Sequence, residues 1–132
     1  MRVVVLDTHT LVWFLQKDSR LSKKALKLIL QDEILKVIPF IVFCEIHHLH
    51  AHGKFALSAA EAADRIDDIH HFEIAPHSQR QLPHLLSGLE IHDSLIVATG
   101  LEQKEIHRSD VAILSRDEDI QEHSPIPVIW DD

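Results

Sequence analysis

Short apolar segments alternate with longer segments of helical periodicity, and this alternation constrains the fold more than any other feature of the sequence. Strands that alternate with helices form a mostly parallel sheet covered on both faces, so we expect an α/β protein built as a three-layer α/β/α sandwich. The expected strands lie near residues 2–6, 35–38, 72–75, 111–114 and 127–130, and the expected helices near residues 8–16, 21–32, 40–52, 58–70, 78–88, 92–105 and 118–122.

Three local signals mark the ends of expected helices. Ser58 followed by Glu61 has the spacing of a capping box, which predicts a helix start. Gly53 stands where a glycine commonly follows the last turn of a helix. Ser22 is a candidate cap for the second helix, although Leu21 leaves its first residue open.

The length and composition indicate a single domain over residues 1–132, because this length buries a core without disulfides or metals. The one cysteine, Cys44, excludes an intramolecular disulfide, and its apolar neighbours predict that it lies in the core. We expect no signal peptide, since Arg2 leads directly into a short strand, and no membrane span, since no apolar run is long enough. A cytoplasmic protein is the resulting expectation.

Four acids lie where the expected elements meet. Asp7 directly follows the first apolar run, and Asp117 stands three residues past the similar run at 111–114. Ligands of parallel sheets bind outside the carboxyl ends of the strands, so these two acids are expected to be neighbours. Glu45 and Asp93 lie on the apolar sides of two expected helices, where an unpaired acid is costly. Together the four would form an oxygen-rich site suited to Mg²⁺ or Mn²⁺.

Each acid taken alone has a simpler interpretation. An aspartate at a strand end or helix start is commonly a turn former or an N-cap. Glu45 is harder to explain in that way, because it lies inside an apolar helical stripe with Val42 and Leu49. The joint pattern of four acids is what favours a metal site.

The formal charge of −8 disfavours a general nucleic-acid coat protein, which would be basic. It does not exclude a nuclease, since an acidic metal site carries its own negative charge until ions bind. Bases do cluster between residues 17 and 27, where they form either a local patch or a solvated helix face. A haloacid-dehalogenase-type phosphatase would carry a second aspartate two residues after Asp7, and His9 stands there instead.

The chain carries four motifs in order, Val4–His9, Phe43–Ile46, His92–Thr99 and Leu114–Asp117. Together they resemble the motifs of PIN domains, and within that family those of the VapC-type toxin ribonucleases of prokaryotic toxin–antitoxin pairs. The resemblance runs over essentially the whole chain, to the final Val128-Ile129-Trp130.

The resemblance implies a Mg²⁺- or Mn²⁺-dependent endoribonuclease. By motif position, Asp7, Glu45 and Asp93 match the three main acids of the family, and Asp117 matches the more variable fourth. Thr8 and Ser115 match hydroxyl residues that support these acids, and Asp119 is either an outer acid of the site or solvent-facing. The mid-helix Gly100 departs from the alanine usual in the family.

The resemblance also implies partners, namely an RNA substrate and a cognate antitoxin protein, and we further expect a homodimer. Leu11, Trp13 and Phe14 are candidates for an apolar surface that such proteins would cover, although Trp13 could equally be core. Two other functions stay open at this point. One is a catalytically silent PIN-like binding module, and the other is a PIN nuclease of RNA processing that has no antitoxin.

Twelve histidines are unusual for this length, and four of them, at positions 47, 48, 50 and 52, share one expected helix. His48 and His52 are four residues apart and could share a metal ion. A solvated polar helix face is the simpler expectation. His9 and His92 adjoin Asp7 and Asp93, where either could orient a ligand, contact RNA or pack locally.

Overall fold

The computed structural model describes residues 2–131 and contains a five-stranded sheet of order β3-β2-β1-β4-β5. Every neighbouring pair of these strands is parallel, which confirms the expected parallel sheet. The strands are β1 Val3–Leu6, β2 Leu35–Pro39, β3 Phe72–Ala75, β4 Val111–Leu114 and β5 Val128–Ile129. The helices are α1 Thr8–Gln16, α2 Lys23–Ile29, α3 Phe40–Ala51, α4 Ala59–Asp67, α5 Ile91–His107 and α6 Glu118–His123, with a 3₁₀ helix η1 Gln79–His84.

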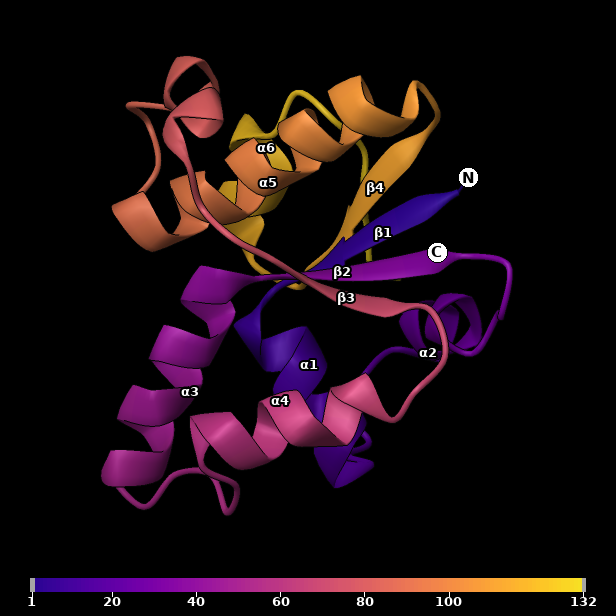
Figure 1. Cartoon of the computed structure of the whole chain (residues 1–132), viewed down its shortest axis with the longest axis vertical. Coiled ribbons are helices and arrows are strands. Elements are labelled where there is room, and N and C mark those ends of the chain that lie inside the picture. The colour runs from indigo at the N-terminus through magenta and orange to yellow at the C-terminus, as the bar shows by residue number, and fades with distance from the viewer. Residues whose placement is uncertain (1, 132) are drawn as a thin grey trace.

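Helices cover both faces of the sheet, which confirms the α/β/α sandwich. Figure 1 shows α5 and α6 on one face and α1, α3 and α4 on the other. The strands β1 and β4 are buried at every position and are almost entirely aliphatic, as strands enclosed on both faces must be. Within residues 2–131, no helix combines the length and the apolar character needed to cross a bilayer.

The order of the strands places β1 beside β4, and this pairing determines where a site can form. The chain builds β1, β2 and β3 outward to one side, then crosses back to place β4 on the other side of β1. In the register of this pair, Leu6 lies opposite Leu114. The residues that follow these two leucines therefore emerge next to each other, at the point where the strand order reverses and where open α/β sheets bind ligands.

The predicted helix ends are confirmed. The Glu61 backbone N–H donates to Ser58 Oγ at 3.1 Å and the Ser58 backbone N–H donates to Glu61 Oε1 at 3.0 Å, which completes the capping box. Gly53 has φ of +70°, and the N–H of the following residue, Lys54, bonds back to the carbonyl of Leu49 at 2.8 Å. Ser22 is the N-cap of α2, so that helix begins at Lys23.

Two expectations are wrong. The helix expected over 78–88 is only the short η1, because Pro83 lies inside it and cannot donate a backbone hydrogen bond. Cys44 is exposed rather than buried. Val42, Phe43 and Ile46 form the buried face of α3, and the helical period turns Cys44 away from that face.

The mid-helix Gly100 has a packing reason. A Cβ at this position would lie 2.5 Å from Cδ1 of the buried Ile126, which is closer than two carbon atoms can approach. The glycine therefore lets the segment before β5 pack directly on α5, which compensates for a helix propensity about 1 kcal/mol below that of alanine.

Candidate active site

Asp7 lies at the carboxyl end of β1 as the N-cap of α1 and is buried. Its Oδ1 accepts hydrogen bonds from the Thr10 backbone N–H at 3.0 Å and from the Thr10 hydroxyl at 2.6 Å. Its Oδ2 accepts a short hydrogen bond from the Ser115 hydroxyl, which belongs to the segment after β4. Asp7 is thus both a helix cap and a fixed carboxylate at the switch point of the sheet.

Ser115 connects the first acid to the last. Its side chain is buried, and the same oxygen that donates to Asp7 accepts the backbone N–H of Asp117 at 3.0 Å. Asp117 is exposed and caps α6, where its Oδ1 accepts the backbone N–H groups of Asp119 at 2.8 Å and Ile120 at 3.0 Å. The Ser115 hydroxyl therefore links the Asp7 carboxylate to the backbone of Asp117.

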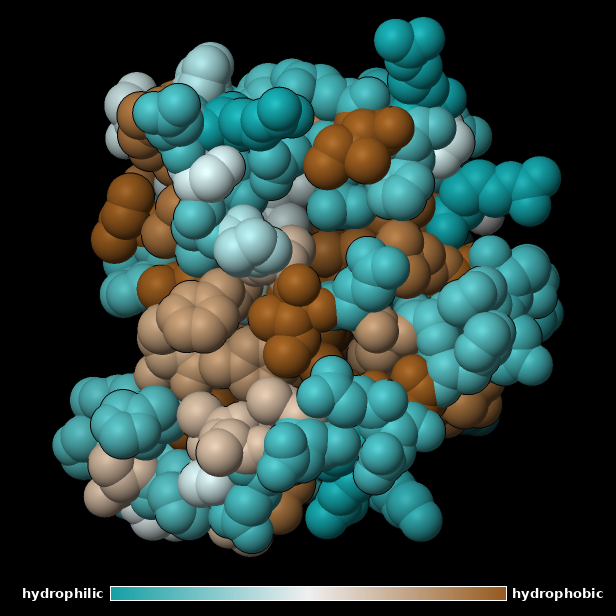
Figure 2. All heavy atoms as spheres, viewed as in Figure 1, coloured by the Kyte–Doolittle hydropathy of each residue, from teal (hydrophilic) through white to brown (hydrophobic). Residues whose placement is uncertain are grey.

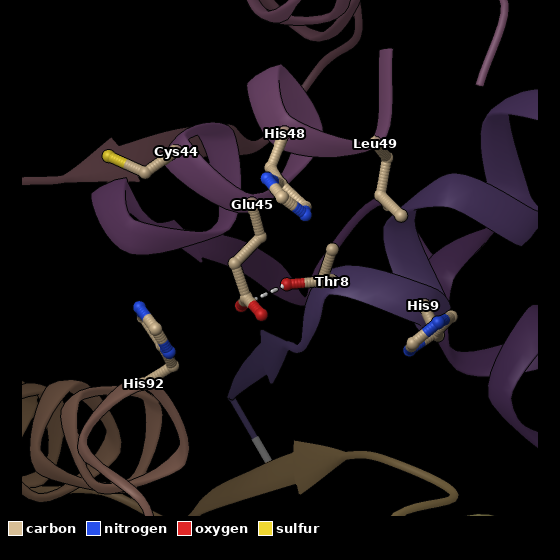
Figure 3. A pocket seen from close by; sticks show the side chains of 7 residues that line it. All are labelled: Thr8, His9, Cys44, Glu45, His48, Leu49 and His92. Atoms are coloured by element: carbon tan, nitrogen blue, oxygen red, sulfur yellow. Dashed lines mark hydrogen bonds between the residues drawn. The ribbon is translucent and has the colours of Figure 1, made fainter. Parts of the chain in front are cut away.

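Glu45 enters the site from α3. It is half-buried, and its Oε1 accepts a hydrogen bond of 2.6 Å from the Thr8 hydroxyl in the first turn of α1. This bond, drawn in Figure 3, joins two helices at the same edge of the sheet. The Thr8 hydroxyl therefore orients the Glu45 carboxylate.

Asp93 enters from the first turn of α5 and has the most informative electrostatics. Burial is the largest cause that raises its pKa, to about 6, and the negative charges of Asp117, Glu90, Glu45 and Asp7 add to the effect in that order. Three segments distant in sequence, with Asp7, Glu45 and Asp117, therefore bring their acids within electrostatic reach of the Asp93 carboxyl group, in addition to the nearby Glu90. No hydrogen bond or ion pair to the Asp93 carboxylate occurs within residues 2–131, so its charge is uncompensated.

The pKa of the buried Asp7 is raised as well, by burial rather than by neighbouring acids. Burial raises its pKa more than the hydrogen bonds from Ser115 and Thr10 lower it, with a smaller lowering from His9. Ionised carboxylates in such places need a cation nearby. A bound cation would offset the free-energy cost of ionising both Asp7 and Asp93 at these positions.

The remaining candidates lie outside this group. Asp119 is exposed in the first turn of α6 and is not among the acids that raise the pKa of Asp93. Trp13 and Leu11 are core residues, so they offer little surface to a partner. The four clustered histidines of α3 and its C-cap are exposed, as a solvated face would be. The His48 and His52 rings lie 4.1 Å apart between centroids, and His52 Nδ1 is 2.8 Å from the His48 carbonyl oxygen.

Two hollows flank the acids. One, of about 330 Å³, is lined by Thr8, Glu45 and three histidines, at positions 9, 48 and 92, together with Cys44 and Leu49. In Figure 3 the His92 ring faces the Glu45 carboxylate across this hollow, whereas the Cys44 sulfur points away from it. The other, of about 260 Å³, is lined by Asp7, His9, Trp13, Arg116 and Asp117. The two share His9.

The donor set fits a hydrated magnesium ion. Within residues 2–131, no three side chains of His, Cys, Asp or Glu stand close enough to form a preassembled metal cage. Magnesium does not need one, because it usually keeps several waters and is held by one or two carboxylates together with substrate phosphates. The uncompensated charge on Asp93 and the buried Asp7 provide the carboxylates for such an ion.

Three residues of the site were not found by sequence reasoning. Thr10 donates its hydroxyl to Asp7 and lies 2.8 Å from the carbonyl of Leu114, so it ties β1 to β4. Its position three residues after an N-cap was the available signal. Glu90 caps α5 and pairs with His92 at 2.6 Å, which places a fifth acid near Asp93. Arg116 had no signal beyond its place between Ser115 and Asp117.

A structure of the PIN domain endonuclease Utp24 is similar to the chain, with a TM-score of 0.49 and 19% identity, covering 96% of this chain and 82% of that one. Curated protein sequences give no match. The family model of the PIN domain matches residues 4–124, which include all four strand-edge acids. The chain belongs to the PIN domain family.

Proposed function

We propose that this chain is a divalent-metal-dependent endoribonuclease whose site consists of Asp7, Glu45, Asp93 and Asp117. PIN domains are typically nucleases that use divalent metal ions, which supports the reaction class. The observation that carries the proposal is the raised pKa of Asp93, caused after burial by the charges of Asp117, Glu90, Glu45 and Asp7. A carboxyl group whose pKa is raised by burial and by neighbouring acids, at a ligand-binding edge, is characteristic of a functional site.

In this proposal the protein residues hold the carboxylates of the site in fixed orientations. Ser115 and Thr10 fix the Asp7 carboxylate, and Thr8 fixes the carboxylate of Glu45. Asp93 remains free of protein donors, so its oxygens are available to a cation or to water near the scissile phosphate. When bound, a divalent ion lowers the pKa of a bound water molecule and stabilises the negative charge on the leaving oxygen. The 2′-hydroxyl of RNA is then not required as the nucleophile.

The first prediction concerns the products and the metal. The purified chain should cut single-stranded RNA in Mg²⁺ or Mn²⁺ and leave 5′-phosphate and 3′-hydroxyl ends, which gel mobility and end-labelling identify. EDTA should abolish the cleavage, and an excess of Mg²⁺ should restore it. Cleavage that persists in EDTA, or products with a 2′,3′-cyclic phosphate, would mean that the 2′-hydroxyl attacks and that the carboxylates have another role.

We further propose that the nuclease is a VapC-type toxin restrained by a cognate antitoxin. A groove of about 610 Å³ between α1, α2 and α4 supports this, since it is mostly apolar and suits a bound segment. Phe14 and Leu15 line it, and the exposed Leu26 and Leu30 extend it. Phe14 was expected on such a surface, whereas Leu11 and Trp13 are buried. An antitoxin arginine reaching the acids would engage them bidentately and displace metal or RNA.

A homodimer is the second partnership that we propose. Apolar side chains of α3, β3 and α4 gather on the face shown in Figure 2, around a hollow of about 410 Å³. Phe40 is half exposed there although it begins a helix beside the edge strand β3. A second copy covering this surface would bury the phenyl ring and protect the edge of the sheet.

The second prediction tests the toxin assignment. Expression of the chain alone should stop bacterial growth, because free ribonuclease activity destroys cellular RNA. Co-expression of the neighbouring reading frame should restore growth, and Asp7→Asn should be harmless yet still bind the neighbour's product in a pull-down assay. Cleavage in vitro without growth inhibition would favour a PIN nuclease of RNA processing. Absence of both would favour a catalytically silent binding module.

A further inference from the structure

An acidic site that cuts RNA has an electrostatic problem beyond its metal ions. The chain carries a formal charge of −8, and the acids near Asp93 add to this locally. Each nucleotide of the substrate brings a further negative phosphate. Binding of RNA therefore needs permanent cations at the rim of the site. Of the residues that line the two hollows flanking the acids, Arg116 is the one with a permanent positive charge.

Arg116 is held in place by an aromatic ring. It lies in the segment between β4 and α6, is exposed, and its guanidinium carbon is 5.9 Å from the centroid of the Trp13 ring. Trp13 is buried and packs against Trp130 at 5.7 Å between centroids. A cation–π contact with a fixed ring limits the motion of the arginine without using its hydrogen-bond donors.

No carboxylate pairs with Arg116 within residues 2–131, and this distinguishes it from the other arginine beside Trp13. Arg20 lies 5.2 Å from the same ring, but its Nε and Nη2 bond to the two Asp18 oxygens at 3.1 and 2.8 Å. The fork of Arg20 is thus already occupied by a carboxylate. The fork of Arg116 is available to an anion at the mouth of the acid cluster.

His9 connects this cation to the other half of the site. It is exposed, its ring lies 5.5 Å from that of Trp13, and it lines both hollows. A strand that contacts Arg116 can therefore pass the acids and His9 and enter the hollow lined by Glu45 and His92. Trp13 is too buried to stack on a base, so its role is to support Arg116.

We propose that Arg116, supported by Trp13, is a binding site for a backbone phosphate of single-stranded RNA and sets the path of the strand across the acids. This phosphate-binding site rests on the proposed ribonuclease function and lies on one side of the acid cluster. A planar guanidinium binds a phosphate through two parallel hydrogen bonds, which fixes orientation as well as position. Arg116 positions the substrate and takes no part in the chemical step.

The test measures RNA binding in the Asp93→Asn background, with Mg²⁺ held constant and sodium chloride varied between about 50 and 200 mM. Fluorescence anisotropy of a short labelled single-stranded RNA reports the dissociation constant. Arg116→Gln should weaken binding about five- to tenfold and reduce the slope of log K against log salt by about 0.7, the value for one phosphate contact on a single strand. Arg116→Lys should restore the slope and only part of the affinity.

Arg2→Gln is the matched control, because Arg2 is an exposed arginine before β1, at the opposite edge of the sheet. It should leave both the affinity and the slope unchanged. If Arg116→Gln keeps the affinity and slope of its background while the otherwise wild-type chain cleaves RNA, the phosphate site is wrong and the ribonuclease function stands. If the wild-type chain neither cleaves nor binds RNA, both proposals fail. An equal loss in Arg2→Gln would show that only net charge matters.

Discussion

Asp93→Asn is expected to lower the rate of metal-dependent RNA cleavage by about 10²–10³-fold, since loss of several kcal/mol of charge stabilisation at a metal site has that effect on a rate. Asp93 is the acid whose charge no protein donor compensates, and four other acids surround it electrostatically. Asp7→Asn and Glu45→Gln should give losses of similar size. Asp117→Asn should lose only about tenfold, because Asp117 is exposed and water can replace a fourth ligand on magnesium.

The control for this series is Asp110→Asn, which makes the same chemical change at an exposed position before β4, at the opposite edge of the sheet. It should cleave at the wild-type rate. Circular dichroism and melting curves would establish that each variant is folded before rates are compared. Near wild-type cleavage by folded Asp93→Asn would remove Asp93 from the site and with it the observation on which the proposed function rests.

The parts of the fold that were predictable are those fixed by local pattern. The strands at 3–6 and 111–114 are aliphatic throughout, and such short runs bounded by helical patterns are typical of strands enclosed on both faces of a parallel sheet. Since ligands bind beyond the carboxyl ends of parallel strands, the sequence places Asp7 and Asp117 at the same edge of the sheet, whereas their adjacency depends on β1 lying beside β4. Asp7 and Asp117 also cap helices, so their interpretation as N-caps was correct. An N-cap role does not prevent either acid from serving in the proposed site.

The parts that were not predictable depend on tertiary contacts. Trp13 was ambiguous because a tryptophan on a helix can lie on either face, and its burial depends on Trp130 from the other end of the chain. Glu90 was missed because the expected helix began at residue 92, whereas α5 begins at Ile91 with Glu90 as its N-cap, three residues before Asp93. The apolar neighbours of Cys44 suggested burial, but a helix in contact with the core on one face exposes such a residue.

The metal-free protein should become less stable as the pH rises from about 4 to 7, because the folded-state pKa of Asp93 is raised to about 6. A carboxyl group with a raised folded pKa favours the folded state while it is protonated, and this contribution is lost as the pH passes through that value. Asp93→Asn removes the negative charge that destabilises the metal-free folded protein at neutral pH. At pH 7.5 the metal-free variant should therefore melt about 4 °C above the metal-free wild type, which corresponds to about 1 kcal/mol after allowance for solvent screening. At pH 4 the two should melt together.

Manganese should reverse this order at pH 7.5. An ion present at a hundred times its dissociation constant stabilises a folded protein by about 2.7 kcal/mol, or about 10 °C for a chain of this size. The wild type should gain this shift, and Asp93→Asn should gain much less, because the acids that hold the ion are fewer. At pH 5 the gain should shrink for the wild type as well, since protons compete with the ion for Asp93. A thermal-shift titration with manganese measures the wild type and Asp93→Asn, each at pH 7.5 and at pH 5. His48→Ala serves as a control for binding at the His48–His52 pair. Equal stabilisation of wild type and Asp93→Asn, lost in His48→Ala, would place the ion on the histidines and leave the acid cluster without a metal.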